Sequence, residues 1–364
     1  MIPMVDLKRQ YHNLKKEIDA AIGDVLEETR FILGPNVSAL EEEVAAYHDL
    51  PYSIGVANGT DALLLALRAC GVEAGDEVIT TPFTFIATAE VIALLKARPV
   101  FVDICPDTYN LDCNQIADKI TSKTKAIIPV HLFGHPADMT PIMEIARKHN
   151  LKVIEDCAQA FGAKYNGRKV GTIGDVGCFS FFPSKNLAGY GDGGMVITKS
   201  EDIARQVKML RNHGSSKRYY HQEIGYNSRL DEIQAAIIRV KLKKIDQFNE
   251  ARRQNAAAYC DAISVKDIIL PMTASGCEHV YHQFTIRVKN RDVLASALQK
   301  KDISSAVYYP VPLHQQDVFI KLYNFSIKLP QSEKCAQEVL SLPMFPELNH
   351  EEIRFIADVI NHAA

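Results

Sequence analysis

The stretch Gly177–Gly194 reads GCFSFFPSKNLAGYGDGG and combines an apolar aromatic run, a proline and a lysine in a glycine-rich loop. The aromatic run is typical of a buried strand. Pro183 has no N–H to give to a strand ladder, so the strand should end there. Lys185 follows in the loop. Partial burial of a lysine lowers its pKa, which an imine-forming lysine requires. Taken alone, Lys185 would be read as one solvated side chain among 41 lysines and arginines.

Composition excludes several other classes of protein. The 364 residues are 47% hydrophobic and 23% charged, as in ordinary soluble globular proteins, and the length suggests two domains. A net charge of −3 gives no electrostatic case for binding nucleic acid or an anionic membrane. We find no signal-peptide pattern and no apolar run of the ~20 residues that span a bilayer. The eight scattered cysteines lack a C-x-x-C pair, which favours a reducing, cytoplasmic location.

The order of expected elements predicts an α/β fold. Between residues 53 and 155, apolar strand patterns alternate with helical ones, which predicts a mostly parallel sheet covered by helices on both faces. Strands over 176–182 and 195–198 follow without a helix between them. A long helix over 230–259 is expected to leave the sheet. We therefore predict a large α/β domain over 1–250, including an N-terminal helix, and a smaller α+β domain over 251–364. The other expected elements that bear on the outcome are a helix over 112–120 and a strand over 305–309.

Three features upstream of the lysine or on its strand could complete a cofactor site. Gly59 allows close backbone approach, and Thr60 and Asp61 open a helix whose free N–H groups favour a phosphate. An ordinary N-cap at Thr60 or Asp61 explains this motif too. Asp156 follows a buried strand and could hold a protonated pyridine nitrogen, or could simply cap a helix or form an internal ion pair. Ser180 could bind a phosphate oxygen or a backbone group. Together with Lys185, this set is what pyridoxal 5′-phosphate (PLP) needs, and an aromatic ring such as Phe83 or Phe85 could cover the cofactor.

The sequence resembles the DegT/DnrJ/EryC1/StrS family of nucleotide-sugar aminotransferases over almost the whole chain. The resemblance implies fold type I, the aspartate aminotransferase fold, with a mostly parallel sheet of the seven-stranded type between helices. The motifs that carry it are Ala57–Leu63 (ANGTDAL), Glu155–Gln159 (EDCAQ), Phe179–Leu187 (FSFFPSKNL), Gly191–Gly194 (GDGG) and Gly225–Leu230 (GYNSRL).

The resemblance also implies roles for individual residues. Lys185 would be the Schiff-base lysine and proton shuttle, and Asp156 would pair with the pyridine nitrogen. The other cofactor-binding roles fall on Gln159 at the ring hydroxyl, on Phe85 stacked on the ring, and on Gly59, Thr60 and Ser180 at the phosphate. Asn227 resembles the asparagine that reaches the neighbouring subunit's cofactor, which implies a homodimer with shared active sites.

The substrate is expected to be a keto nucleotide sugar, aminated from L-glutamate. Phe182 stands where members that aminate C-4 tend to carry histidine, so the C-3 branch is favoured. Lys185 argues against the related dehydratases, which carry histidine there. Candidate substrate contacts are Tyr220, Arg229, Tyr309 and His314, and no histidine set suggests a metal.

Three alternatives remain open from the sequence. One is a C-4 aminotransferase of the same family. Another is a different fold-type-I enzyme, such as a lyase or an amino-acid aminotransferase. The third is a cofactor-binding regulator without catalysis. Cell-envelope polysaccharide synthesis is an expectation from the family only.

Overall fold

A seven-stranded sheet forms the centre of the protein, whose structure is a computed structural model that describes residues 1–363. The strands are β1 (Tyr52–Val56), β2 (Glu77–Thr80), β3 (Arg98–Phe101), β4 (Thr124–Ile127), β5 (Lys152–Asp156), β8 (Val176–Ser180) and β9 (Gly194–Thr198). Their order across the sheet is β1-β9-β8-β5-β4-β2-β3. The five strands from β8 to β3 are parallel, whereas β9 is antiparallel to both of its neighbours. The mostly parallel α/β fold predicted from the sequence is confirmed.

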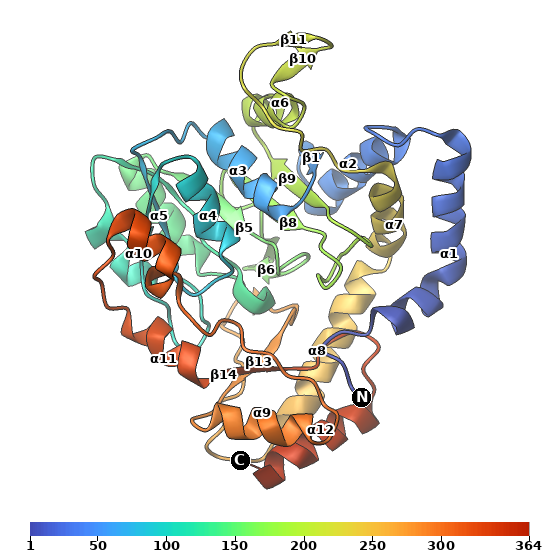
Figure 1. Cartoon of the computed structure of the whole chain (residues 1–364), viewed down its shortest axis with the longest axis vertical. Coiled ribbons are helices and arrows are strands. Elements are labelled where there is room, and N and C mark those ends of the chain that lie inside the picture. The colour runs from blue at the N-terminus through green and yellow to red at the C-terminus, as the bar shows by residue number, and fades with distance from the viewer. Residues whose placement is uncertain (364) are drawn as a thin grey trace.

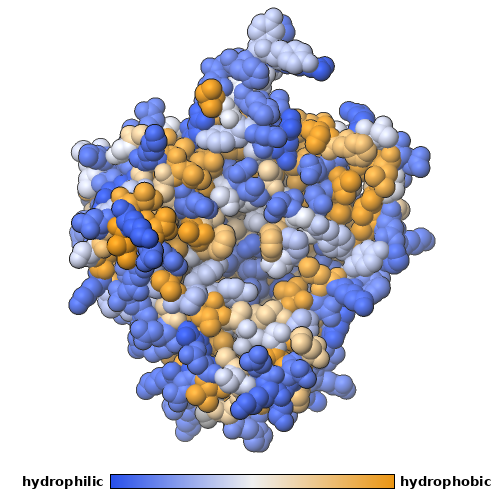
Figure 2. Space-filling view, viewed as in Figure 1, coloured by the Kyte–Doolittle hydropathy of each residue, from blue (hydrophilic) through white to orange (hydrophobic). Residues whose placement is uncertain are grey.

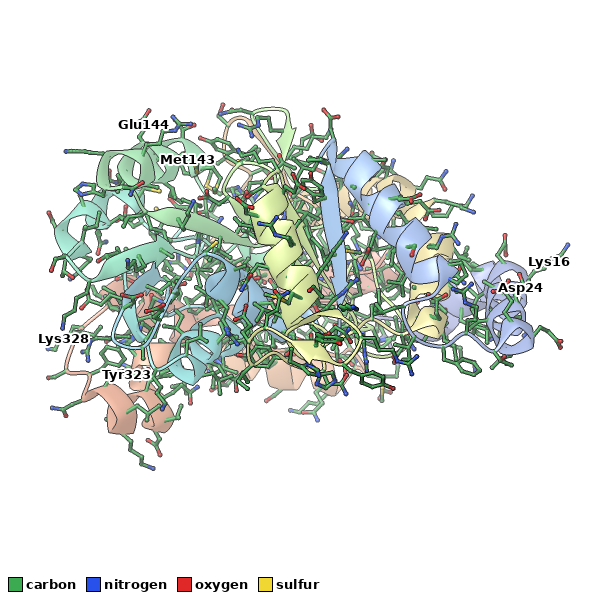
Figure 3. All side chains as sticks on the ribbon, turned by 90° about the horizontal axis from the view of Figure 1, so that it is seen from above. Lys16, Asp24, Met143, Glu144, Tyr323 and Lys328 are labelled. Carbon is green, nitrogen blue, oxygen red and sulfur yellow. The ribbon has the colours of Figure 1, made fainter. Side chains whose placement is uncertain are left out.

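Helices cover both faces of this sheet (Figure 1). Successive strand residues point to opposite faces, so Ile154 packs with α3 (Gly59–Ala69), α4 (Ala87–Leu94) and α6 (Glu201–Leu210). Val153 packs on the other face with α5 (Met139–His149). On that second face, α2 (Pro35–His48) and α7 (Glu232–Leu242) cover the strands nearer β1. In Figure 3, Lys16 and Asp24 of α1 (Leu7–Glu28) lie at the opposite end of the molecule from Met143 and Glu144 of α5.

A second apolar core lies in the C-terminal part of the chain. It joins α8 (Ile245–Ala262), β13 (Phe284–Arg287), α9 (Arg291–Gln299), β14 (Val339–Leu342) and α12 (His350–Ala363). The first residues of the chain belong here too. Ile2 and Val5 pack against this core, Ile2 forms a parallel bridge with Ile303, and Arg9 pairs with Glu352. The division at residue 250 stays a prediction.

The remaining short elements lie in the connections. They are β6 (Lys164–Tyr165), β7 (Arg168–Lys169), β10 (Ser215–Lys217), β11 (Tyr220–His221), β12 (Cys277–Glu278), α10 (Asp317–Tyr323), α11 (Pro330–Glu338) and the 3₁₀ turns η3 (Leu132–Gly134) and η4 (Leu313–Gln315). Within residues 1–363, none of the helices has the length and apolar character needed to cross a bilayer.

Three expected elements are corrected by the structure. The helix expected over 112–120 is two 3₁₀ turns, η1 (Cys113–Gln115) and η2 (Ala117–Lys119). The long helix expected over 230–259 is interrupted between α7 and α8, because α7 packs on α1 and α2 whereas α8 packs on α12. The strand expected over 305–309 forms only an isolated bridge between Ala306 and Ser341.

Candidate active site

A cavity of about 620 Å³ opens where several parallel strands of the sheet end. This is the edge at which open α/β sheets bind their ligands. The cavity collects the loops that follow β1, β2, β5 and β8, together with two segments of the C-terminal part of the chain. Its lining residues include Gly59, Thr60, Thr84, Phe85, Thr88, Asp156, Gln159, Ser180, Phe182, Lys185, Asp192, His282, Gln283, Tyr308 and Tyr309.

Lys185 lies in a tight turn after the end of β8. Its N–H donates to the carbonyl of Phe182 at 2.8 Å, and the N–H of Gly189 returns to the carbonyl of Phe181 at 2.8 Å. Burial lowers the pKa of Lys185 to about 8, against the opposing attraction of Asp156. Among residues 1–363, no hydrogen bond or ion pair reaches Nζ of Lys185. The amine therefore combines a lowered proton affinity with free access to the cavity.

Asp156 ends β5 and is only 6% exposed. Its Oδ2 accepts a hydrogen bond from the Thr88 hydroxyl at 2.8 Å, and its Oδ1 accepts one from the N–H of Ala158 at 3.1 Å. Burial raises the pKa of Asp156, while the Thr88 and Ala158 hydrogen bonds oppose that rise. No ion pair within the described part of the chain reaches this carboxylate. A buried acid of this kind is suited to receive a cationic group from a ligand.

The N-terminus of α3 faces the strand that carries Ser180. Asn58 caps the helix, because its Oδ1 accepts the N–H of Asp61 at 2.8 Å. The N–H groups of Gly59 and Thr60 come before the first intrahelical bond and point toward the helix entrance. A Cβ on Gly59 would come within 2.6 Å of the Cβ of Ser180. Only glycine therefore lets the helix entrance and the serine approach closely enough to form one anion cradle.

Aromatic and amide groups close the cavity on the side of the C-terminal segments. Oε1 of Gln159 accepts the N–H of Phe133 at 2.6 Å, and its Nε2 donates to the Tyr309 hydroxyl at 3.2 Å. Phe85 is 56% exposed at the rim, with its ring 6.3 Å from that of Tyr309. Phe83, the other aromatic candidate, is fully buried among apolar residues and cannot cover a ligand in the cavity.

Four predicted residues lie outside this cavity. Asn227 is exposed, and Tyr220 is 64% exposed on the β10–β11 hairpin, which projects beyond α6 in Figure 1. Arg229 has a buried Nε without a hydrogen-bond partner within residues 1–363. His314 is buried, and its Nε2 lies 3.1 Å from Oε1 of Glu333, so the structure does not bring it to the cavity.

Several lining residues were not identified from the sequence. Thr84 and Thr88 follow β2. Two threonines four residues apart are too common in sequences to indicate a site, and their role is visible only in the structure, where Thr88 donates to Asp156. His282 and Gln283 come from the segment before β13, far away in the sequence. Such long-range contributions carry no local pattern.

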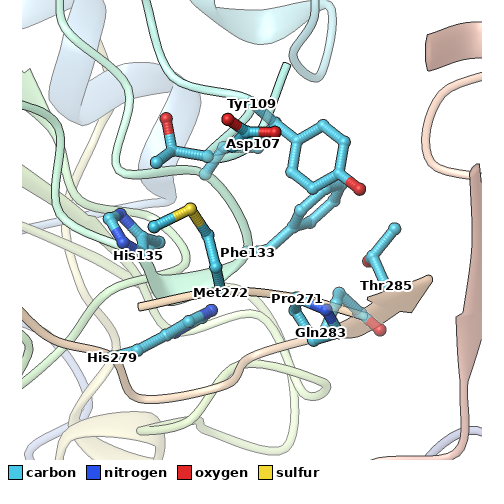
Figure 4. A pocket seen from close by; sticks show the side chains of 11 residues that line it. Asp107, Tyr109, Phe133, His135, Pro271, Met272, His279, Gln283 and Thr285 are labelled. Carbon is cyan, nitrogen blue, oxygen red and sulfur yellow. The ribbon is translucent and has the colours of Figure 1, made fainter. Parts of the chain in front are cut away.

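One residue cluster and one small cavity near the site give no reason to expect a second ligand. His131, Glu155 and Cys157 lie close enough to hold a metal, but Glu155 already accepts hydrogen bonds from three backbone N–H groups and meets His131. A smaller cavity of about 10 Å³ has room for one water. Figure 4 shows Gln283, which lines both cavities, close to Pro271 and Thr285 in this smaller one.

The residues present fit PLP. A buried carboxylate without an ion-pair partner suits the pyridine nitrogen, and a lysine of lowered pKa suits the aldehyde. The cradle between Gly59 and Ser180, which a Cβ would fill, suits the phosphate. All three open into one cavity.

Comparisons with known proteins agree with this geometry. The family model for the DegT/DnrJ/EryC1/StrS aminotransferase family, which is PLP-dependent, matches residues 12–361. A UDP-N-acetyl-3-dehydro-alpha-D-glucosamine 3-aminotransferase of Acidithiobacillus ferrooxidans is 51% identical over 359 residues, 99% of this chain and 97% of that protein. A pleiotropic regulatory protein of Geobacillus stearothermophilus is 51% identical over 362 residues, again 99% and 97%. The crystal structure of DesV from S. venezuelae in complex with an intermediate has a TM-score of 0.97 at 42% identity, covering 99% of this chain and 98% of that one. The chain therefore belongs to the DegT/DnrJ/EryC1/StrS aminotransferase family.

Proposed function

We propose that this protein binds PLP and uses it to transfer the amino group of L-glutamate to the 3-keto position of a UDP- or dTDP-linked hexose. The observation that carries the proposal is the opening of Lys185, Asp156 and the Gly59–Ser180 cradle into one cavity. The 3-aminotransferase at 51% identity supports the sugar position. Phe182, which lines the cavity three residues before the lysine, fits the same branch.

Each residue has a task in this reaction. Bound PLP supplies an aldehyde that bonds to amines and a ring that accepts electrons from the neighbouring carbon. Lys185 would hold the cofactor at rest and then, as a free amine, take a proton from the donor's α-carbon and return it to the cofactor side. Asp156 would hold the ring nitrogen in its protonated form. The helix entrance at Gly59 and Thr60, with Ser180, would bind the phosphate, while Phe85 covers the ring and Gln159 binds its hydroxyl.

The decisive experiment compares Lys185→Ala with the unchanged protein, given PLP, L-glutamate and a 3-keto nucleotide sugar. We expect the unchanged protein to form 2-oxoglutarate and amino sugar in equal amounts, and the variant to lose turnover by about 10⁴-fold or more while it retains PLP. Lys208→Ala, at an exposed position on α6, is the matched control and should stay active. Normal turnover by Lys185→Ala would refute the proposal.

The same assay separates the alternatives. A C-4 enzyme would aminate a 4-keto sugar instead, which NMR of the product shows directly. Glutamate consumption without any keto sugar, or with keto acids, would indicate another fold-type-I reaction. The regulatory name of one relative keeps a non-catalytic role as a second candidate, and PLP binding without amino transfer would favour it.

We also propose a homodimer with shared active sites. Exposed apolar side chains support it, namely Phe31, Ile32 and Ile224, and Figure 2 shows such side chains gathered near α1 and α2. Asn227, Tyr220 and Arg229, whose buried Nε has no hydrogen-bond partner within residues 1–363, would then face the neighbouring subunit's cavity. The test co-expresses Lys185→Ala with Asn227→Ala, since a mixed dimer keeps one intact site only if the sites are shared. Activity no higher than that of the separate variants would contradict sharing.

A further inference from the structure

His282 lines the catalytic cavity beside Lys185, although it comes from the segment before β13. The side chain is almost completely buried. Its Nδ1 lies 3.1 Å from Oδ1 of Asn186, the residue that directly follows the lysine. This contact links the C-terminal segment to the lysine loop.

The surrounding hydrogen bonds fix which nitrogen of His282 carries the proton. Nδ2 of Asn186 donates to Oδ1 of Asn249 at 2.8 Å and to the carbonyl of Val280 at 3.0 Å, so the amide of Asn186 has only its oxygen left to face the ring. Asn249 is itself oriented, because its Nδ2 donates to the carbonyl of Phe161 at 2.9 Å. His282 must therefore donate from Nδ1 to Asn186, which leaves Nε2 with a lone pair.

The ring is held in its neutral form. Burial lowers the pKa of His282 well below its usual value, and the nearby charges of Lys185, Arg252 and His279 act in the same direction. No hydrogen bond reaches Nε2 from any residue between 1 and 363. The cavity thus contains a rigid, uncharged acceptor without a donor.

The amine of Lys185 lacks hydrogen-bond acceptors within residues 1–363. Whenever its amine is free and protonated, Nζ carries three N–H donors, and within the described chain none has an acceptor. The oxygens of Asp156 already receive hydrogen bonds from Thr88 and Ala158 and would also hold the cofactor nitrogen. An acceptor elsewhere in the cavity is needed to keep the freed amine in place.

We infer that His282 is a positioning residue whose Nε2 accepts a hydrogen bond from the free ammonium group of Lys185 and holds it near the reacting carbon between the two halves of amino transfer. The inference deepens the proposed function, since it rests on the role of Lys185. Asn186 and Asn249 serve it by fixing the orientation of the imidazole.

The experiment measures the pKa of Lys185 in the full-length protein freed of cofactor, from the pH dependence of its acetylation read by mass spectrometry. His282→Leu and His282→Gln have similar volumes, but only glutamine keeps an acceptor. We expect the pKa of Lys185 to fall by about one unit in His282→Leu, because the ammonium loses its acceptor, and to stay within about 0.3 unit in His282→Gln. Acetylation of the exposed Lys208 in the same samples is the internal reference.

Two outcomes of the acetylation experiment would overturn the inference. Equal shifts in both variants would show that packing alone matters, and no shift in His282→Leu would show that the ring accepts nothing from Lys185. Nitrogen-15 NMR of labelled histidine in the unchanged protein tests the tautomer without any variant. Protonated Nδ1 and bare Nε2 are expected from pH 6 to pH 9, and a proton on Nε2 would refute the inference. Neither readout uses substrate, so its failure leaves amino transfer itself unchallenged.

Discussion

Glu155 and Asp156 are neighbouring buried carboxylates on opposite faces of β5, and their surroundings differ completely. Glu155 accepts the N–H groups of Gly171, Ile173 and Gly174 at 2.7–2.8 Å and meets Nε2 of His131 at 3.0 Å. Burial would raise the pKa of Glu155, but the hydrogen bonds from His131 and the backbone outweigh it, and the pKa is lowered.

Asp156 has one hydroxyl and one N–H, and its pKa is raised by burial. The difference separates structure from function. A carboxylate whose oxygens are fully used stabilises the fold and has nothing to offer a ligand. One that is buried, underused and open to a cavity has its remaining capacity directed at whatever enters.

Exchanging the cavity-side carboxylate should have the largest effect. Asp156→Asn is expected to reduce amino transfer by about 10³-fold, because the cationic ring nitrogen loses its counter-charge. The free energy of unfolding should not fall, because a neutral amide is easier to bury than a carboxylate. Steady-state kinetics and urea unfolding measure the two effects. Turnover within tenfold of the unchanged protein would remove the proposed role.

Substitution of Glu155 should instead lower stability and leave activity nearly unchanged. Glu155→Gln places an NH₂ group against backbone donors, and we expect a loss of about 3 kcal/mol in the free energy of unfolding. Once folded, this variant should turn over substrate much as the unchanged protein does. Urea denaturation checks the first point and kinetics at low temperature the second. A Glu155→Gln variant that is stable but inactive would contradict this distinction, because Glu155 would then be needed for activity and not for stability.

The lysine on the cavity side gives a pH dependence. Its pKa is lowered to about 8, so the amine is mainly protonated at pH 7 and mainly neutral at pH 9. Because only the neutral amine bonds to an aldehyde, the rate of PLP incorporation into cofactor-free protein should rise about tenfold between these values. Stopped-flow absorbance measures the rate. A rise centred near pH 10.5 would mean that the amine is solvated.

The smallest effect concerns the support of Asp156. Thr88→Val keeps the shape but removes the hydroxyl that donates to Oδ2, and turnover should fall about fivefold. Thr84→Val removes a hydroxyl that contacts only Thr88 among the described side chains, at 3.1 Å, and should act more weakly. The ratio of the two turnover numbers is the measurement. An equal or larger loss of turnover in Thr84→Val would contradict the prediction that Thr84 acts on Asp156 only through Thr88.

Local patterns were enough to predict the strand-end residues of the site. The apolar run before Asp156 and the aromatic run before Pro183 each indicate a candidate site residue near the end of a buried strand: Asp156 ends β5, and Lys185 lies in the turn that follows β8. Parallel packing of those strands then brings them to the same edge. Assignment of the fold followed from the same alternation, and the resemblance to a family supplied the roles.

Features that depend on distant partners were not predictable. His282 meets Asn186 across 96 residues of sequence, and the tautomer of its ring depends on two further contacts. The break between α7 and α8 has no glycine or proline to mark it, because it arises where the packing partners change. Local propensity contains no information about either.

The pairing of Ile2 with Ile303 and of Arg9 with Glu352 has a consequence for synthesis on the ribosome. Residues 1–9, which pack on the C-terminal core, are synthesised before it. Glu352, the partner of Arg9, is made 343 residues after the arginine. At about 5–20 residues per second, this segment waits for roughly 20–70 s with its apolar side chains uncovered. The contact of Arg9 with Glu352 can therefore form only after α12 has left the exit tunnel.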